Sequence, residues 1–471
     1  MTILQIGVLA ALALVAGRWP RGRQLSMLAI SAFAVFWLQP PEPFPSLQFW
    51  FPIATLGITI IGWGLTVTAE VRGWRQNWPA AAILVSVPLL VDMNRYAGLG
   101  QIFITSTPSV SAVVLVLLVL AGIAALMARM QAASPILRAL GLLGIVLLFV
   151  FLKTPALLLH ATQWLAVSAR SAPAEGLTPL SWLGFSYVAF RLMHTIRDRQ
   201  SGRLPPVRLS EYVNYVIFFP AFTAGPIDRA ERFVAELRSP LPLADEDWID
   251  AGTRFFVGLF KKFVVADLLA VISISDLLVP LVKTPGWLWI FLYAYAFRIY
   301  FDFSGYTDVA IGMGRLMGIR LPENFASPYL KPNLTQFWNS WHMTLTQWFR
   351  AYIFNPVARA MRSAKRPLPG WSIILVAQVG TMLLIGLWHG VAWHFAAWGL
   401  WHGLGLFVHN RWSDFTRSRV PTWAQSRAGR VGASALGVFV TFNFVTLGWL
   451  FFALSTPSLA WRTLLRCLGL A

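Results

Sequence analysis

Apolar segments recur along the whole chain, separated by short polar loops. Many of these segments approach the roughly 20 residues that an α-helix needs to cross a bilayer. The clearest are 109–127, 139–159, 286–303, 371–388 and 436–454. The pattern predicts an all-α polytopic membrane protein, with about 11–13 membrane helices and additional re-entrant segments.

The composition supports this fold class. Of 471 residues, 57% are hydrophobic and only 12% are charged, whereas soluble domains carry about 25% charged residues. The first apolar run, 3–16, lacks a basic segment before it and a cleavage site after it, so we expect a retained span. Cys467 is the only cysteine and therefore forms no intrachain disulfide.

The net charge of +19 does not indicate a nucleic-acid partner, because the basic residues gather in alternate short loops. Membrane proteins place such loops on the cytoplasmic side. Loop 18–24 is basic, loop 39–48 has no basic residue, and residues 191–211 are again rich in arginine. We therefore expect a multi-pass protein of the cell membrane, with an extracytoplasmic N-terminus and residues 191–211 inside.

The chain is predicted to form a single membrane domain over residues 1–471. Residues 1–175 resemble a scaffold of six ordinary spans, and polar and aromatic residues become frequent over 180–410. Residues 411–471 are expected to form a cytoplasmic basic loop and a final span. No internal repeat of the kind found in many transporters is present.

Two apolar segments are too short and too polar for simple spans. They are 212–226 and 333–356, and basic residues flank both ends of each. Such flanks predict that each segment enters the membrane and returns to the cytoplasmic side, around a cavity that opens to the cytoplasm. Helices that lie flat at the membrane interface are the alternative for either segment.

Five of the seven histidines follow residue 340. Ionisable groups at membrane depth are costly and point to function, although a structural histidine is the common alternative. His389 ends an apolar run and is followed by Gly390, which leaves room for a substrate beside the ring. A neutral imidazole there is suited to accept a proton from an alcohol. His342 lies on the second re-entrant segment, within reach of an inner cavity.

Other polar residues have structural interpretations. His394, His402 and His409 share one face of a predicted helix, but side chains two turns apart do not chelate one ion alone. No acidic cluster, HExxH motif or cysteine pair accompanies them, so we expect neither a metal nor a tightly bound cofactor. Arg298 and Asp302 are four residues apart and are predicted to form a structural ion pair.

Four long motifs allow a family comparison. They are FFPAFTAGPIDRAERF at 218–233, YFDFSGYTDVAIGMGRLMGIRLPENF at 300–325, FWNSWHMTLTQWFRAYIF at 337–354 and GLWHGVAWHFAAWGLWHG at 386–403. In order and spacing, the chain resembles the membrane-bound O-acyltransferase (MBOAT) family over roughly residues 180–410. Within its bacterial DltB/AlgI-like branch, the motifs are closer to the DltB side.

The resemblance implies a ring of helices around a central tunnel. It also implies an acyl donor, the phosphopantetheine thioester of a small carrier protein at the cytoplasmic face, and an extracytoplasmic hydroxyl as acceptor. A membrane-anchored accessory protein that relays acyl groups is a further possible partner. The family's histidines map onto His389 and His342 as catalytic residues. Residues implied to contact substrate or to line the tunnel are Trp338, Asn339, Trp341, Arg350 and Trp388.

Two positions depart from the family pattern on the donor side. Ala351 stands where an aspartate usually follows the arginine, and Ser340 stands where an arginine often precedes Trp-His. The function expected from the resemblance is transfer of an acyl group, foremost D-alanyl, to an envelope polymer such as teichoic acid. The alternatives are O-acetylation of an exopolysaccharide, a transporter or flippase of an envelope precursor, and an assembly subunit that recruits a separate transferase.

Overall fold

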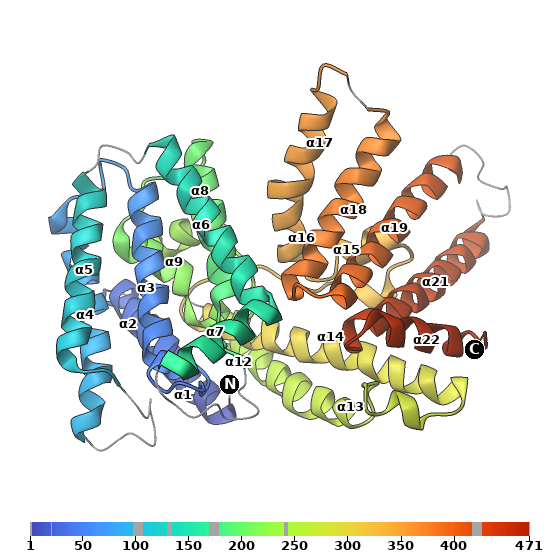
Figure 1. Cartoon of the computed structure of the whole chain (residues 1–471), viewed down its shortest axis with the longest axis horizontal. Helices are drawn as coiled ribbons and strands as arrows, with labels where there is room; N and C mark the ends of the chain where they lie inside the picture. The colour runs from blue at the N-terminus through green and yellow to red at the C-terminus, as the bar shows by residue number, and fades with distance from the viewer. Residues whose placement is uncertain are drawn as a thin grey trace. The chain divides into compact units, whose positions relative to one another are not determined.

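The computed structural model describes residues 2–19, 21–97, 107–129, 134–168, 179–239, 244–366, 368–416 and 426–470. These residues form helices and loops without a strand, which confirms the all-α prediction (Figure 1). Five of the described helices are long and apolar enough to cross a membrane. They are α3 (Leu47–Thr66), α5 (Val110–Arg129), α6 (Pro135–Lys153), α18 (Gly370–His389) and α21 (Arg427–Ala453).

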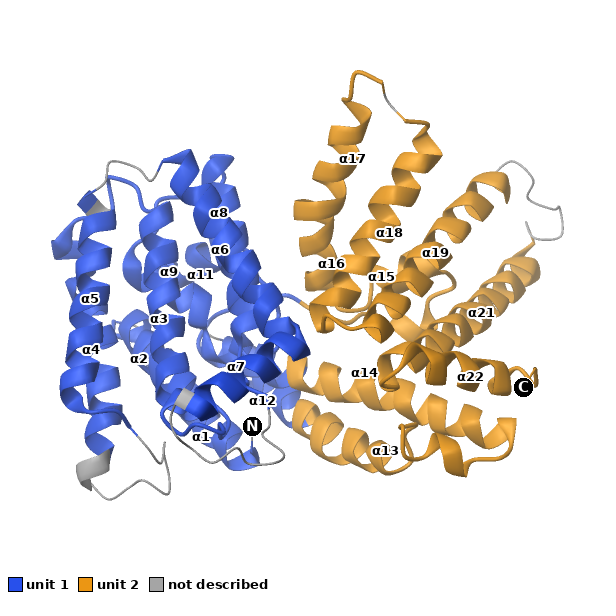
Figure 2. Cartoon of the chain, viewed as in Figure 1, with its two compact units in different colours: residues 1–256, 308–322 blue, residues 257–307, 323–471 orange. Residues whose placement is uncertain are grey.

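The chain divides into two compact units, which Figure 2 colours separately. Unit 1 comprises Met1–Phe256 and Asp308–Pro322, and unit 2 comprises Val257–Thr307 and Glu323–Ala471. Besides α3, α5 and α6, unit 1 contains α1 (Ile3–Gly17), α2 (Arg23–Trp37), α4 (Trp74–Ala97), α7 (Pro155–Ser168), α8 (Phe185–Gln200), α9 (Leu209–Ile217), α10 (Phe219–Phe222) and α11 (Ala230–Arg238). Helix α12 (Asp245–Phe260) continues from unit 1 into unit 2.

Unit 2 carries the histidine-rich part of the chain. Besides α18 and α21, its helices are η1 (Lys261–Ala266), α13 (Asp267–Val271), η2 (Val279–Leu281), η3 (Pro328–Leu330), α15 (Leu334–Trp338), α16 (Met343–Phe349), η4 (Arg350–Phe354), α17 (Asn355–Arg362), α19 (Trp393–Thr416) and α22 (Pro457–Cys467). The long helix α14 (Pro285–Leu316) belongs mostly to unit 2, and its last residues belong to unit 1.

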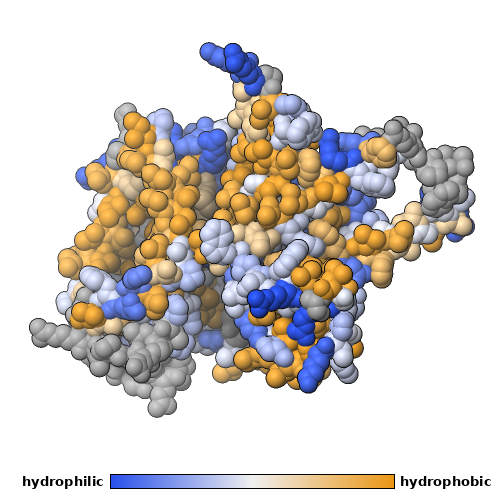
Figure 3. All heavy atoms as spheres, turned by 45° about the vertical axis from the view of Figure 1, so that its right-hand side comes forward, coloured by the Kyte–Doolittle hydropathy of each residue, from blue (hydrophilic) through white to orange (hydrophobic). Residues whose placement is uncertain are grey.

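Several helices present apolar side chains outward, as expected for contact with lipid. The apolar windows of α5 and α6 are only 6% and 0% buried inside the protein, against 67% for α3. Figure 3 shows apolar residues over much of the visible surface, with polar residues in separate patches. These exposed apolar faces fit a hydrocarbon surrounding better than water.

The predicted boundaries need three corrections. The run 139–159 is not one helix, because α6 ends at Lys153 and α7 begins at Pro155. Proline disfavours helical backbone at the preceding residue, here Thr154, which is extended. The runs 286–303 and 436–454 are parts of longer helices, since α14 and α21 extend well beyond them.

Both predicted re-entrant segments are broken into short pieces. Residues 212–226 fall in α9, α10 and the loop that follows, while 333–356 fall in α15, α16, η4 and the start of α17. Arg191 of α8 stabilises the first segment by donating to the carbonyls of Val216, Ala221 and Pro226. Its guanidinium thereby satisfies backbone groups that a continuous helix would have paired internally.

Candidate active site in unit 2

The antiparallel pair α18 and α19 places His389, and glycines allow the two backbones to approach closely. A Cβ at Gly399 would lie 2.5 Å from the carbonyl oxygen of Met382, and one at Gly386 would overlap the carbonyl of Phe395. Small residues are the usual means by which membrane helices pack backbone to backbone. This packing fixes the C-terminal end of α18, where His389 lies.

His389 lies in a box of aromatic rings and remains partly exposed. Its ring centroid is 4.5 Å from that of Trp388, 4.8 Å from Phe452, 5.6 Å from Trp398 and 5.9 Å from Phe395. The rings restrict the orientation of the imidazole. The surrounding rings do not enclose the imidazole completely.

His342 is buried and starts helix α16 in the left-handed backbone region, with φ of 42°. Non-glycine residues adopt this conformation uncommonly, and strained residues tend to cluster at functional sites. The His342 ring packs edge-on against Phe303 at 4.6 Å and against Trp388 at 6.1 Å. Trp388 therefore contacts both histidines and forms a shared wall between them.

Hydrogen bonds around Asn324 indicate the tautomer of His342. The Asn324 side-chain oxygen accepts from the backbone N–H of Thr344 at 3.4 Å and from its hydroxyl at 2.7 Å. This oxygen also lies 3.3 Å from His342 Nδ1, so Nδ1 carries the proton. His342 Nε2 has no partner among the described residues and is left as the basic nitrogen.

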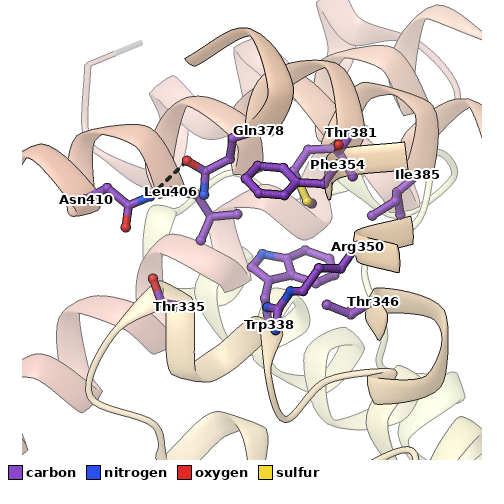
Figure 4. Close-up of a pocket in the computed structure, with 11 residues that line it drawn as sticks. Thr335, Trp338, Thr346, Arg350, Phe354, Gln378, Thr381, Ile385, Leu406 and Asn410 are labelled. Carbon is purple, nitrogen blue, oxygen red and sulfur yellow. Dashed lines mark hydrogen bonds between the residues drawn. The ribbon is translucent and has the colours of Figure 1, made fainter. Parts of the chain in front are cut away.

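Unit 2 contains a cavity of about 300 Å³ (Figure 4), and neither His342 nor His389 is among the residues that line it. Its lining comes from α15, α16, η4, α18 and α19: Thr335, Trp338, Thr346, Arg350, Phe354, Gln378, Thr381, Met382, Ile385, Leu406 and Asn410. Among these lining residues only Arg350 is charged. In Figure 4, Trp338 and Arg350 lie close together, and Asn410 donates to the Gln378 side chain at 2.9 Å.

The cavity lining continues along two helices toward His389. On α18, Gln378, Met382 and Ile385 line the cavity, and His389 follows one turn later on the same face. On α19, Asn410 and Leu406 line it, and His402 and Trp398 extend that face at intervals of four residues. Asn410 and Trp398 are separated by about 18 Å along the helix, at 1.5 Å per residue. Residues of the cavity lining and of the aromatic box around His389 therefore lie on the same two helices.

Arg350 is exposed at the cavity, in a short π-helical turn. Its Nη2 donates to the side-chain oxygen of Asn339 at 2.6 Å. The neighbouring Ala351 provides no carboxylate to neutralise the guanidinium. Arg350 therefore supplies a positive charge where an anionic group entering the cavity would pass.

The predicted site residues divide between two neighbourhoods. Trp338 and Arg350 line the cavity, Asn339 binds Arg350, and Trp388 touches both histidines. Trp341 instead packs in an aromatic cluster with Phe325, Phe337 and Trp449, and it is not among the cavity-lining residues.

The remaining polar residues differ from one another in their surroundings. His394 lies 3.1 Å from the carbonyl of Phe451, His409 lies 3.1 Å from the Thr335 hydroxyl, and His402 is fully buried. The predicted pair of Arg298 with Asp302 is wrong, because Asp302 pairs with Lys262 of η1 at 2.5 Å. A lysine from another helix reached the carboxylate, which spacing within one helix does not reveal.

Sequence reasoning missed the cavity residues of α18 and α19. Gln378 and Thr381 are polar positions on one face of an otherwise apolar span, which is the signal that marks them. Leu406 and Asn410 carry no such signal individually. They are identified only by the packing of α19 against α18.

The protein is helical and carries long apolar helices, and two of its histidines contact the same indole, that of Trp388. A cavity lies on the same helices as these histidines. These features define the class to which the protein is compared. The sequence matches the model of the MBOAT, membrane-bound O-acyltransferase family, over residues 117–451. The chain therefore belongs to this family of O-acyltransferases.

The chain is also similar to curated proteins that are named as acyl- or acetyltransferases. A teichoic acid D-alanyltransferase of Streptococcus thermophilus is 32% identical over 288 residues, 58% of this chain and 68% of that protein. A probable alginate O-acetylase AlgI of Pseudomonas aeruginosa is 32% identical, over 59% of this chain and 50% of its own length. A peptidoglycan O-acetyltransferase of Helicobacter pylori is 34% identical, over 55% and 47%.

Proposed function

We propose that this protein transfers an acyl group from a carrier-protein thioester at the cytoplasmic side to a hydroxyl of a cell-envelope polymer. The observation that carries the proposal is the place of His389 on α18, one turn beyond the cavity-lining residue Ile385 and on the same face. A donor entering the cavity would bring its acyl group toward the two histidines. The aromatic box leaves His389 accessible to an acceptor.

The reaction requires two proton transfers, one from the acceptor hydroxyl and one to the leaving thiolate. His389 takes the proton from the acceptor hydroxyl as its oxygen attacks the thioester carbonyl carbon. The new C–O bond forms, the C–S bond breaks, and the leaving thiolate takes up a proton, so that an ester and a thiol result. His342, with its basic Nε2 beside Trp388, orients the donor or assists this proton transfer.

We further propose D-alanyl as the first candidate for the acyl group and acetyl as the second, since relatives named for either activity are about a third identical to this chain over the matched part. The corresponding acceptors are a teichoic-acid-type polymer and another envelope glycan. Arg350 and the basic turn of Arg359, Arg362, Lys365 and Arg366 would attract an acidic carrier protein at the cytoplasmic face. An N-terminus outside the cytoplasm is consistent with this orientation.

Mass spectrometry of esters released by mild base from cell envelopes tests the proposal. Cells with the wild-type protein are expected to yield an acyl group that disappears with His389→Ala, while the amount of protein in the membrane stays the same. The matched control is His160→Ala, since His160 is exposed on α7. Undiminished ester with His389→Ala would refute the mechanism, and transport of unmodified substrate would identify a transporter.

A further inference from the structure

His402 is a buried histidine to which the proposed chemistry gives no role. It lies on α19, fully buried, between the rings of Trp338 and Trp398, with centroid distances of 5.2 Å and 5.0 Å. Phe337, Phe444 and Trp449 complete the surrounding cluster. No acidic side chain is among these ring contacts, so the apolar surroundings favour a neutral imidazole.

Four polar atoms in this cluster have no protein partner within the described part of the chain. They are Nδ1 and Nε2 of His402 and the indole Nε1 atoms of Trp338 and Trp398. Leaving a buried donor or acceptor unsatisfied costs about 1–3 kcal/mol for each group. A cluster with four such atoms therefore requires a partner that the surrounding side chains do not supply.

One water molecule can satisfy three of these four atoms, namely the two indole N–H groups and the unprotonated nitrogen of His402. Each indole offers only a donor, and a neutral imidazole offers one donor and one acceptor. A water that accepts from Trp338 and Trp398 and donates to the bare nitrogen of His402 makes three hydrogen bonds. Three is the typical number for a buried water.

Helix α21 packs closely against the imidazole. A Cβ added at Gly448 would lie 2.9 Å from His402 Nε2, closer than side chains normally pack. Glycine within a helix costs up to about 1 kcal/mol relative to alanine, so its presence here has a packing reason. The glycine allows helix α21 to pack closely against the His402 ring.

The cluster contacts both the cavity and the aromatic box around His389. Trp338 lines the cavity, and Leu406, one turn from His402, lines it too. On the other side, Trp398 packs edge-on against the His389 ring at 5.6 Å. Any change in the orientation of these two indoles therefore moves one wall of the cavity and one wall of the His389 box.

We propose that His402, Trp338 and Trp398 bind a buried water, and that His402 is a positioning residue for His389. Through the shared water, His402 fixes the two indoles that connect the cavity to the His389 box. The water site is inferred from the contacts of the cluster alone. The effect on His389 is inferred from these contacts together with the proposed acyl transfer.

Substitution of His402 separates hydrogen bonding from packing. His402→Phe keeps an aromatic ring of similar size and removes both nitrogens, and His402→Gln retains a donor and an acceptor. With acyl-loaded carrier as donor, we expect His402→Phe to lower kcat on the order of 10- to 100-fold, with the donor KM unchanged. His402→Gln should recover part of the loss, and wild-type kcat in His402→Phe would overturn the positioning role.

Nitrogen-15 NMR of protein labelled only at histidine tests the water site independently of activity. The signal that disappears in His402→Phe belongs to His402, and we expect one protonated nitrogen and one hydrogen-bonded acceptor nitrogen. An acceptor nitrogen with the chemical shift of an unbonded imidazole would overturn the water site. If the wild-type protein transfers no acyl group, the proposed function fails, while this measurement still decides the water site.

Gly448→Ala provides a second perturbation that leaves His402 itself intact. The added methyl group would press on the His402 imidazole and on the Trp401 indole, so kcat should fall and the His402 acceptor signal should move. Gly432→Ala on the same helix is the matched control, because a Cβ there meets nothing within 4 Å. Equal effects of the two substitutions on kcat and on the His402 signal would contradict the assignment.

Discussion

Buried histidines of the two units differ in how their nitrogens are used. In unit 1, His194 Nε2 lies 2.7 Å from the hydroxyl of Tyr215, which donates onward to the carbonyl of Asp228 at 2.8 Å. In unit 2, His342 Nε2 and both nitrogens of His402 have no protein partner within the described residues. A histidine bonded within the protein stabilises the fold, whereas a buried basic nitrogen without a protein partner is available to a substrate or to water.

The arginines show the same difference. Arg191 in unit 1 is buried and binds three backbone carbonyls around the 216–226 loop. Arg350 in unit 2 is exposed at the cavity and binds only the Asn339 side chain among the described groups. We therefore expect substitutions in unit 1 to change the amount of folded protein, and substitutions in unit 2 to change kinetics.

The largest effect is expected for the buried histidines His342 and His194, on kcat for His342 and on folded yield for His194. His342→Ala should lower kcat by about 10²–10⁴-fold, because general acid–base groups contribute on this scale. His194→Phe should reduce the yield of folded protein and leave kcat per folded molecule near the wild-type value. Purification by size exclusion followed by turnover measurement on the monodisperse fraction separates the two results. Normal kcat in His342→Ala would remove this histidine from the mechanism.

Arg191→Met should produce the next largest effect, on stability. The substitution removes the donor that three carbonyls share. The carbonyl of Ala221 keeps the backbone N–H of Gly225, and each group left unsatisfied costs about 1–3 kcal/mol. We expect a lower thermal unfolding midpoint in detergent, measured by intrinsic fluorescence. Arg462→Met on the exposed face of α22 is the control and should leave the midpoint unchanged. A normal midpoint in Arg191→Met would refute the structural role.

Gly399→Ala tests the close contact that positions His389. Its Cβ would press against the Met382 carbonyl, and overpacking of this kind costs about 1–3 kcal/mol. We expect a lower kcat, because α18 and α19 must separate. Gly380→Ala on α18 is the matched control, since its Cβ meets nothing within 4 Å. Unchanged kcat in Gly399→Ala would show that this contact does not set the active geometry.

Arg350→Gln should have the smallest effect and should act on donor binding. Loss of the positive charge at the cavity is expected to raise the KM for the carrier thioester by about tenfold, with little change in kcat. The wild-type KM should rise with salt concentration, and that of the variant should rise less. An unchanged KM at low salt would remove Arg350 from donor recognition.

The sequence was sufficient for the fold class and for the most apolar helices. Spans 109–127 and 371–388 match α5 and α18 closely, because long apolar runs have few alternatives in a membrane. The break at Pro155 was missed because flanking apolar residues concealed it. The segments around Tyr212 and His342 were correctly set apart from ordinary spans, since their length and basic flanks did not fit one.

The site was only partly accessible to sequence reasoning. His389 and His342 were selected by position and by resemblance, but their common contact with Trp388 requires tertiary structure. The pairing of Asp302 with Lys262 depends on the packing of η1 against α14. The distinction between His402 and its neighbours His394 and His409 depends on hydrogen-bond partners, which spacing on a helix does not determine.

Reconstituted transfer with purified components tests the central claim most directly. Wild-type protein in vesicles, supplied with acyl-loaded carrier on the face of Arg350 and with a polymer acceptor on the opposite face, should consume one thioester for each ester formed. His389→Ala, folded and inserted to the same extent, should form no ester above the uncatalysed rate. Ester formation by His389→Ala at a rate near that of the wild type would contradict the account.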